Sequence, residues 1–208
     1  MSEHPEIVEG RLTGARLGEA VEVTVRAFDD DPFSRYLFPH SRHRRRATRL
    51  QQRDTFSKNG AIGLTRSAID DGRIVGVALW IPPGAWPLPS KTTLSQRVLT
   101  LRAYFPNLAV LTKIRPTFQA VDASHPIEPH WYLQVMTVDP SRQRQGIGGA
   151  LLAPTLESCD ADGLPAWLET QKEANVRYYE RFGFQVEAVH APTPGVPPLW
   201  TMRRTPAR

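Results

Sequence analysis

The stretch Val135-Met136-Thr137-Val138-Asp139-Pro140-Ser141-Arg142-Gln143-Arg144-Gln145-Gly146-Ile147-Gly148-Gly149 joins a predicted strand to a predicted helix through a basic loop. The first residues are apolar or β-branched and predict a buried strand. Glycines let the loop turn its N–H groups toward one point, and the helix N-terminus adds about half a positive charge there. These features predict a pyrophosphate site; a helix start that merely packs closely is the alternative.

Two familiar nucleotide-binding loops do not match this stretch. The Walker pattern is absent, because no Gly-Lys-Ser/Thr follows the glycines. The dinucleotide pattern is incomplete, and no early βαβ unit surrounds it.

The rest of the chain shows the hydrophobic spacings of further strands and helices. Expected strands cover residues 6–11, 61–69, 73–81, 131–138, 166–170, 185–190 and 199–203, and expected helices cover 16–28, 41–56, 92–104, 107–120, 146–159 and 173–182. Asp71-Gly72 favours a hairpin, Ser41 is a reasonable N-cap, and Pro154 predicts a kink or a tight first section in its helix. Strands that alternate with helices after a hairpin indicate a mixed α/β sheet.

Residues 82–129 interrupt this alternation. The segment opens with Pro82-Pro83-Gly84 and closes with Pro126 and Pro129. The segment is too short and too often interrupted by proline to form its own hydrophobic core. We therefore expect an insertion between two strands of one sheet. Residues 1–208 should therefore form a single domain, in which 82–129 helps to shape a substrate pocket.

Composition narrows the class of protein. The 208 residues fit one full-sized domain. The composition, with 40% apolar and 23% charged residues, excludes a disordered chain as the default. The single cysteine, Cys159, excludes a disulfide framework, and the six histidines lack metal-ligand spacing, so we expect no metal. The longest apolar run, 74–81, is too short for a membrane helix, and no signal peptide is visible. We expect a cytoplasmic protein with no membrane partner.

Six arginines crowd into residues 42–53 of a chain with a net charge of +5. A basic patch of this kind can bind nucleic acid. The spacing of Arg42, Arg46, Arg49 and Arg53 also fits the solvated face of a helix. Since no nucleic-acid-binding motif accompanies the arginines, we expect no nucleic-acid partner.

A second informative stretch follows the glycine loop. Leu168-Glu169-Thr170 ends a predicted strand with a carboxylate, and Asn175 and Tyr178-Tyr179-Glu180-Arg181-Phe182-Gly183-Phe184 belong to the next helix and turn. Each feature alone has a structural explanation: an edge-strand charge, a helix cap, a core ring and a C-terminal glycine.

Together, the two stretches resemble the GCN5-related N-acetyltransferases, the GNAT family. Gln143-Arg144-Gln145-Gly146-Ile147-Gly148 is similar to that family's Gln/Arg-x-x-Gly-x-Gly/Ala acetyl-CoA loop, and residues 179–184 are similar to its Tyr-Glu-x-x-Gly-Phe element. Order and separation agree over residues 130–203, whereas the first 80 residues match only loosely. Within the family the chain looks most like puromycin N-acetyltransferase and its relatives, through residues 128–133, 168–170 and Asn175. Asn175 stands four residues before Tyr179, closer than in many family members.

The resemblance implies the GNAT fold, an α/β (α+β) arrangement. Its mixed, mostly antiparallel sheet is splayed between the fourth and fifth strands and flanked by helices. Acetyl-CoA, as cosubstrate, would lie in the splay between the strands that end at Val138 and Thr170. The residues implied to bind it are Met136, Thr137, Val138, Arg144, Gln145, Gly146, Ile147, Gly148, Gly149 and Asn175.

The resemblance also implies direct attack of an amine on the thioester. Glu169 is the candidate base, acting through water; with a reference pKa of about 4.3 it needs burial or a water relay to deprotonate an ammonium. Tyr179, with a reference pKa near 10, suits protonation of the departing thiolate. Cys159 is a poor nucleophile candidate, because no paired histidine is expected near it.

The acceptor stays open at this stage. A primary amine of a small molecule is the leading expectation; it could be antibiotic-like, with antibiotic resistance as the role. The alternatives are an acetyltransferase for protein amines and a catalytically silent acetyl-CoA-binding sensor or interaction module, and a homodimer is also left open. Residues 82–129 and the segment 29–40 are expected to shape the acceptor pocket, and its candidate walls are Phe33, Tyr36, Trp86, Tyr104, Phe105 and Trp131.

Overall fold

The computed structural model describes residues 5–88, 94–105 and 107–207. Its strands are β1 (Glu6–Glu9), β2 (Leu64–Asp70), β3 (Arg73–Ile81), β4 (Trp131–Val138), β5 (Ala166–Thr170), β6 (Gln185–His190) and β7 (Leu199–Arg204). Its helices are α1 (Gly14–Ala27), α2 (Pro32–Leu37), α3 (Ser41–Lys58), α4 (Leu94–Tyr104), α5 (Val110–Ser124), α6 (Ile147–Asp162) and α7 (Glu173–Glu180).

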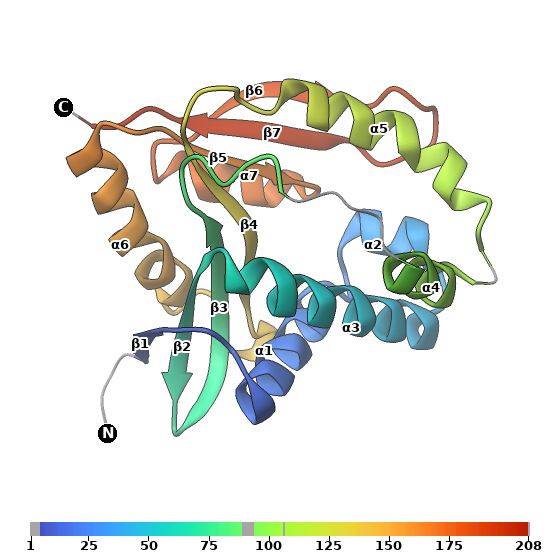
Figure 1. Ribbon diagram of the computed structural model, residues 1–208, viewed down its shortest axis with the longest axis horizontal. Helices are drawn as coiled ribbons and strands as arrows, with labels where there is room; N and C mark the ends of the chain where they lie inside the picture. Colours follow the sequence, from blue (N-terminus) through green and yellow to red (C-terminus); the bar gives the residue numbers. More distant parts are fainter. Residues whose placement is uncertain (1–4, 89–93, 106, 208) are drawn as a thin grey trace.

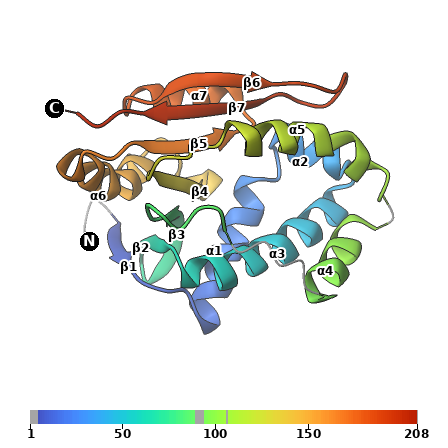
Figure 2. The same ribbon diagram turned by 45° about the horizontal axis from the view of Figure 1, so that its top comes forward.

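The strands form one sheet in the order β1-β2-β3-β4-β5-β7-β6. Every neighbouring pair is antiparallel except β4 and β5, which run parallel. The sheet is strongly twisted: β2 and β3 stand steeply in Figure 1, whereas β6 and β7 lie nearly across them. Figure 2 shows β6 and β7 above β5, with α5 alongside.

β4 and β5 pair over only three residues. Residues 131–133 of β4 face residues 166–168 of β5, and the pairing stops there. Beyond that point β4 still pairs with β3 as far as Val138, and β5 still pairs with β7 as far as Thr170. The two strands therefore diverge, which confirms the predicted splay between the fourth and fifth strands.

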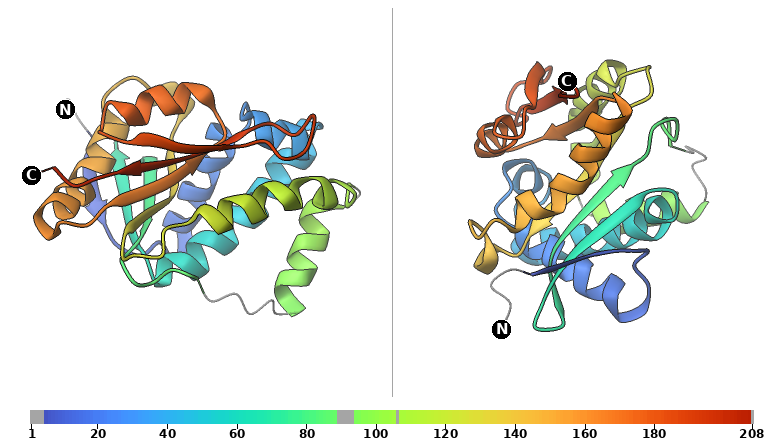
Figure 3. Two further views of the ribbon diagram at one scale, coloured as in Figure 1. Left: turned by 90° about the horizontal axis from the view of Figure 1, so that it is seen from above. Right: turned by 90° about the vertical axis from the view of Figure 1, so that its left-hand side faces the viewer.

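Helices cover both faces of the sheet, as the alternation along β3 shows. Val77 and Leu79 pack with α1, whereas Ala78 and Trp80 pack with α6. In the left view of Figure 3, α7 and α5 likewise lie on opposite sides of the C-terminal strands. α4 and α5 come from the segment between β3 and β4, which are neighbours in the sheet.

Two local predictions have different outcomes. The Asp71-Gly72 hairpin is confirmed, since both residues have positive φ (45° and 72°), as a tight two-residue turn requires. The Ser41 cap is wrong, because α3 begins at Ser41 and His40 occupies the cap position without a side-chain hydrogen bond.

The short helix α2, which the sequence analysis did not predict, begins where Asp29-Asp30-Asp31-Pro32 ends α1. Asp31 caps it by accepting a hydrogen bond from Ser34 N (2.8 Å). Pro32 takes the first helical position, where its missing N–H has no intrahelical partner to lose.

Candidate active site

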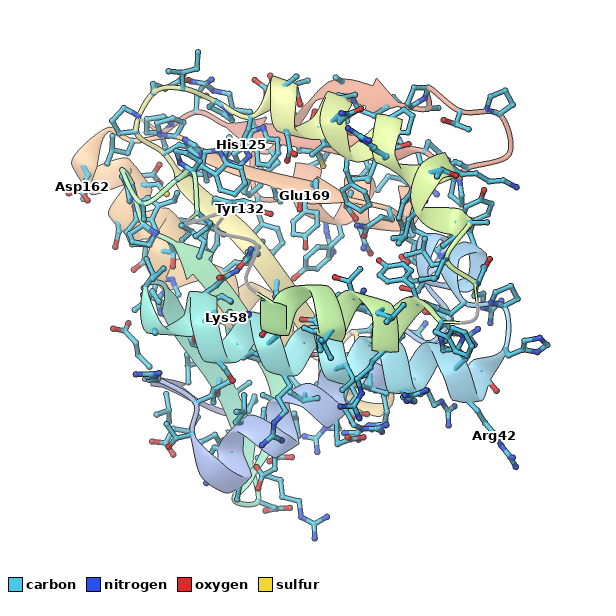
Figure 4. All side chains as sticks on the ribbon, turned by 45° about the vertical axis from the view of Figure 1, so that its right-hand side comes forward. Arg42, Lys58, His125, Tyr132, Asp162 and Glu169 are labelled. Carbon is cyan, nitrogen blue, oxygen red and sulfur yellow. The ribbon has the colours of Figure 1, made fainter. Side chains whose placement is uncertain are left out.

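Glu169 lies in β5, one residue past the last pairing with β4. Its Oε1 accepts a hydrogen bond from Tyr132 Oη (2.7 Å). Its Oε2 is buried and has no hydrogen-bond partner among the described residues. Tyr132 thus holds one oxygen of the carboxylate and leaves the other unpaired; Figure 4 shows the two side chains next to each other.

Burial raises the pKa of Glu169 from its ordinary value of 4.5 to about 7. The hydrogen bond from Tyr132 acts in the opposite direction because it stabilises the carboxylate, and the charge of Asp122 raises the pKa further. A carboxyl group with a pKa near 7 is about half ionised at neutral pH, which is the range suited to a general base.

A neutral aromatic cluster packs behind Tyr132. The Tyr132 ring meets Trp86 and His125 edge-on at 5.4 and 5.0 Å, and His125 stacks on Trp86 at 3.8 Å. Burial, with the neighbouring His130, lowers the pKa of His125 to about 3. His130 Nδ1 donates to the Glu128 carbonyl (2.7 Å), so its Nε2 accepts from His125 Nε2 (2.9 Å) when the ring is neutral. This packing fixes the position of the tyrosine hydroxyl.

A cavity of about 250 Å³ passes through the splay. Residues 133–136 of β4 and 169–171 at the end of β5 line it where the strands have separated. Leu168 packs on the α6 face of the sheet, so Glu169 points to the opposite face, whereas Tyr179 packs on the α6 face. Since both Glu169 and Tyr179 line the cavity, it connects the two faces of the sheet.

Tyr179 lies on α7 with 7% of its surface exposed. Burial raises its pKa above the usual value of 10, and the neighbouring Tyr178 and Glu169 raise it further, so the hydroxyl keeps its proton at neutral pH. Asn175 also lines the cavity and donates from Nδ2 to Thr170 Oγ1 (3.1 Å). Asn175 and Tyr179 are four residues apart, so their side chains lie on the same face of α7.

The glycine loop presents backbone donors at the start of α6. Arg144 and Gly146 both have positive φ (62° and 79°). Gly146 is the N-cap of α6 and supplies no side-chain cap, so the first N–H groups of the helix have no intrahelical partner. Arg142 anchors the loop by pairing with Asp70 and by donating to Gln145 Oε1 (3.0 Å). This combination suits an anion.

Gly148 and Tyr178 shape the space above this helix start. A Cβ on Gly148 would collide with Tyr178 Oη and lie 2.7 Å from Met136 Cε, so any larger residue would displace the ends of these two side chains. Tyr178 Oη is buried without a hydrogen-bond partner among the described residues, and burial raises its pKa to about 12. A hydroxyl donor without a partner, beside free helix N–H groups, fits the diphosphate arm of coenzyme A.

The structure brings most of the predicted cofactor residues together. The surroundings of Gly148 place Met136 of β4 beside the start of α6, and Gln143 Nε2 donates to the Val138 carbonyl (3.2 Å). Two side chains point elsewhere: Ile147 is buried in the core, and Thr137 Oγ1 lies 3.2 Å from Thr24 Oγ1. Only the backbone of Ile147 and Thr137 can therefore serve a ligand in the splay.

The acceptor side of the cavity differs from the walls expected. Phe33 and Tyr104 line the cavity, but Tyr36, Trp86, Phe105 and Trp131 do not. Phe105 is 62% exposed, and Trp86 belongs to the aromatic cluster. Four further lining residues, Asp31, Ser34, Leu37 and Phe118, fall in the segments 29–40 and 82–129 that were expected to shape the pocket. The sequence reasoning missed Phe28, Thr48, Gln51 and Gln52.

Tyr132 was also missed as a site residue, although the sequence holds one signal for it. A tyrosine near the start of a buried strand usually finds a hydrogen-bond partner for its hydroxyl. The parallel register sets Tyr132 opposite Trp167, two residues before Glu169. Gln51 and Gln52 carry no comparable signal within an arginine-rich helix.

Three of the six clustered arginines form ion pairs between helices. Arg44 and Arg45 both pair with Asp29 (3.1 and 2.6 Å), and Arg49 pairs with Glu22 (2.5 Å). These ion pairs join α3 to α1 and to the turn that follows it, while Arg42 projects outward at one end of α3 (Figure 4). The arrangement fits the helix-face interpretation.

Several other features bear on the chemistry. Cys159 is buried, and burial raises the pKa of its thiol to about 11. Within residues 5–88, 94–105 and 107–207, no group of three or more His, Cys, Asp or Glu side chains is placed to hold a metal ion. In the same described part of the chain, no helix has both the length and the apolar character needed to cross a bilayer.

Comparison with known proteins agrees with this geometry. The model of the acetyltransferase (GNAT) family matches residues 25–184. An uncharacterised N-acetyltransferase of Schizosaccharomyces pombe is 28% identical over 180 residues, which cover 80% of this chain and 69% of that protein.

Solved structures share the fold. A histone acetyltransferase HPA2-related acetyltransferase from Corynebacterium glutamicum has a TM-score of 0.70 at 24% identity, with 99% of this chain and 98% of that chain covered. The PaiA N-acetyltransferase of Thermoplasma acidophilum, solved with coenzyme A, has a TM-score of 0.56 at 13% identity, with 96% and 99% covered. A family match over most of the chain, joined to the splayed sheet, shows that the chain belongs to the GNAT family and is an acetyl-CoA-dependent N-acetyltransferase.

Proposed function

We propose that the enzyme acetylates a primary amine of a small molecule, with Glu169 as the general base. One observation carries this proposal: Glu169 lines the cavity at the splay with a carboxyl group whose pKa is about 7, and its buried Oε2 has no hydrogen-bond partner among the described residues. Oε2 would accept the proton of the incoming ammonium, directly or through one water, while Tyr132 holds Oε1.

Acetyl-CoA supplies the acetyl thioester. The backbone edge of Met136–Val138 would hold the pantetheine arm, and the N–H groups of residues 144–149 would hold the pyrophosphate, with Tyr178 Oη as an added donor. Asn175 would contact the arm from α7, near Tyr179. The neutral Tyr179 hydroxyl would give its proton to the leaving thiolate, since it lines the cavity on the α7 face.

A small acceptor is favoured by the shape of the site. The cavity is about 250 Å³, and Glu169 lies within it rather than on an open surface. The acceptor could be an antibiotic amine, as in puromycin N-acetyltransferase, which the chain resembles around residues 128–133. A protein amine would have to bring its reactive nitrogen into the same space.

A thiol-release assay over a panel of small amines, puromycin included, and of peptide N-termini and lysines tests the proposal. We expect turnover with small amines and a loss of roughly 10²-fold or more in kcat for Glu169→Gln, as is usual for general bases. Because Gln removes a charge that is costly to bury, the variant should unfold at an equal or higher temperature at pH 8, where wild-type Glu169 is ionised. Turnover with peptides alone would overturn the small-molecule acceptor.

A further inference from the structure

The acceptor side of the cavity holds carboxylates and no basic side chain. Asp31 and Glu169 line it, together with the amides of Gln51 and Gln52, whereas no lysine or arginine of the described residues does so. The chain as a whole has 26 lysines and arginines against 21 acidic residues. A cavity whose charge opposes that of its chain favours a cationic ligand.

Asp31 differs from the two aspartates that precede it. Asp29 pairs with two arginines of α3, and Asp30 pairs with Lys172 (2.8 Å). Asp31 is 9% exposed, and within the described part of the chain it forms no ion pair. Its Oδ1 accepts the N–H of Ser34 as the cap of α2, which engages one of its two oxygens.

Asp31 and Glu169 are held by different elements of the fold. Asp31 caps α2 through the N–H of Ser34, whereas Glu169 lies in β5 and accepts a hydrogen bond from Tyr132. The two carboxylates therefore enter the lining of the cavity from separate segments of the chain.

Apolar rings and one further acceptor complete this side of the cavity. Phe28, Phe33 and Phe118 line it, and the rings of Phe33 and Phe118 meet edge-to-face at 5.6 Å. Gln52 Oε1 is buried on the same wall without a partner among the described residues. The surface is thus apolar, with hydrogen-bond acceptors at separate points.

We propose that the acceptor is a dibasic amine, whose reactive nitrogen meets Glu169 while a second, protonated nitrogen binds Asp31. This inference rests on the proposed function and adds the chemical class of the acceptor. The aromatic walls suit the hydrocarbon between the nitrogens and attract a cation through their ring faces. Gln52 Oε1 accepts a further hydrogen bond from the second nitrogen. An acceptor with a methyl group in that place leaves the buried carboxylate unpaired.

The test compares linear α,ω-diamines of increasing length with the monoamines of equal length. For the best chain length, kcat/KM should be at least about tenfold higher for the diamine than for the monoamine. This ratio corresponds to the free energy that a hydrogen bond to a charged group contributes. Asp31→Asn should lower the diamine-to-monoamine ratio by at least about tenfold, because asparagine still caps α2 but carries no charge. Asp30→Asn is the matched control; it removes the neighbouring, lysine-paired charge and should leave the ratio unchanged.

Equal kcat/KM for diamines and monoamines at every length overturns the inference. So does an Asp31→Asn variant that lowers both rates equally, because that result assigns Asp31 to capping alone. If wild type acetylates no amine, the proposed function fails, and calorimetric titration of the same diamines then decides the inference separately. Diamine binding that Asp31→Asn weakens and Asp30→Asn preserves supports it, and no binding, or binding equal in all three proteins, overturns it.

Discussion

At the scale of the residue, the site depends on one hydrogen bond between two buried side chains, Tyr132 and Glu169. Tyr132 donates to Glu169 Oε1 and so lowers the pKa of a carboxyl group that burial raises to about 7. Without that hydrogen bond, burial alone would leave the base protonated over more of the neutral range. Tyr132 is therefore a positioning residue that also keeps the base ionised.

Removal of the Tyr132 hydroxyl should move the acid side of the pH–rate profile upward. In wild type, kcat/KM should rise with pH and level off above about pH 7, as Glu169 loses its proton. Tyr132→Phe keeps the ring in the aromatic cluster but raises the Glu169 pKa, so the acid limb should shift by about one pH unit to higher pH. One acceptor must be used throughout, so that its own titration cancels. A shift to lower pH, or no shift, would contradict this role.

The two adjacent tyrosines of α7 should give opposite kinetic signatures. Tyr179 lines the cavity, whereas Tyr178 Oη lies beside Gly148, because successive helical residues point about 100° apart. Tyr179→Phe should lower kcat by roughly 10²-fold with little change in the KM for acetyl-CoA. Tyr178→Phe should instead raise that KM by about two- to tenfold, which corresponds to the contribution of one neutral hydrogen bond to binding. Its kcat should be nearly unchanged. Equal, near-wild-type values for both variants would leave water as the proton source.

At the scale of the element, the start of α6 lies very close to its neighbours at Gly148. Gly148→Ala would place a methyl group against Tyr178 Oη and 2.7 Å from Met136 Cε, so both side chains must shift beside the proposed cofactor site. We expect the affinity for acetyl-CoA, measured by calorimetry, to fall at least about tenfold, with a small change in melting temperature. Gly18→Ala in α1 is the matched control: its Cβ meets nothing within 4 Å, so affinity should be unchanged and stability slightly higher. Equal affinities in both variants would misplace the cofactor site.

Local pattern was enough to predict most elements. β4, at residues 131–138, matches its predicted range, since its apolar run is bounded by prolines. The hairpin at Asp71-Gly72 follows from turn chemistry alone. α2 was missed because six residues are too few to show a helical period, and the cap at residue 41 was misplaced because His40 offers no cap signature.

At the scale of the whole molecule, the site is harder to predict, because its parts come from distant segments. The glycine loop and the residues of α7 stand in continuous motifs, so Gly148 and Tyr179 could be singled out from the sequence. Asp31, Gln52 and Tyr132 lie 37 or more residues from Glu169 in the chain and join it in the site only through the fold. No local pattern distinguishes a pocket-lining glutamine from a solvated one.

The two halves of the sheet are joined by strand pairing over only three residues of β4. A ligand in the splay would therefore bridge the two halves. Acetyl-CoA at about 100 times its Kd should stabilise the fold by about 2.7 kcal/mol, which corresponds to a rise of about 5–10 °C in Tm for a chain of this size. Amide hydrogen exchange should slow at residues 134–138, at the start of α6 and in α7, and much less in α3. Gly148→Ala should reduce both effects at the same ligand concentration. Protection centred on α3, or a Tm shift that Gly148→Ala leaves intact, would place the cofactor outside the splay.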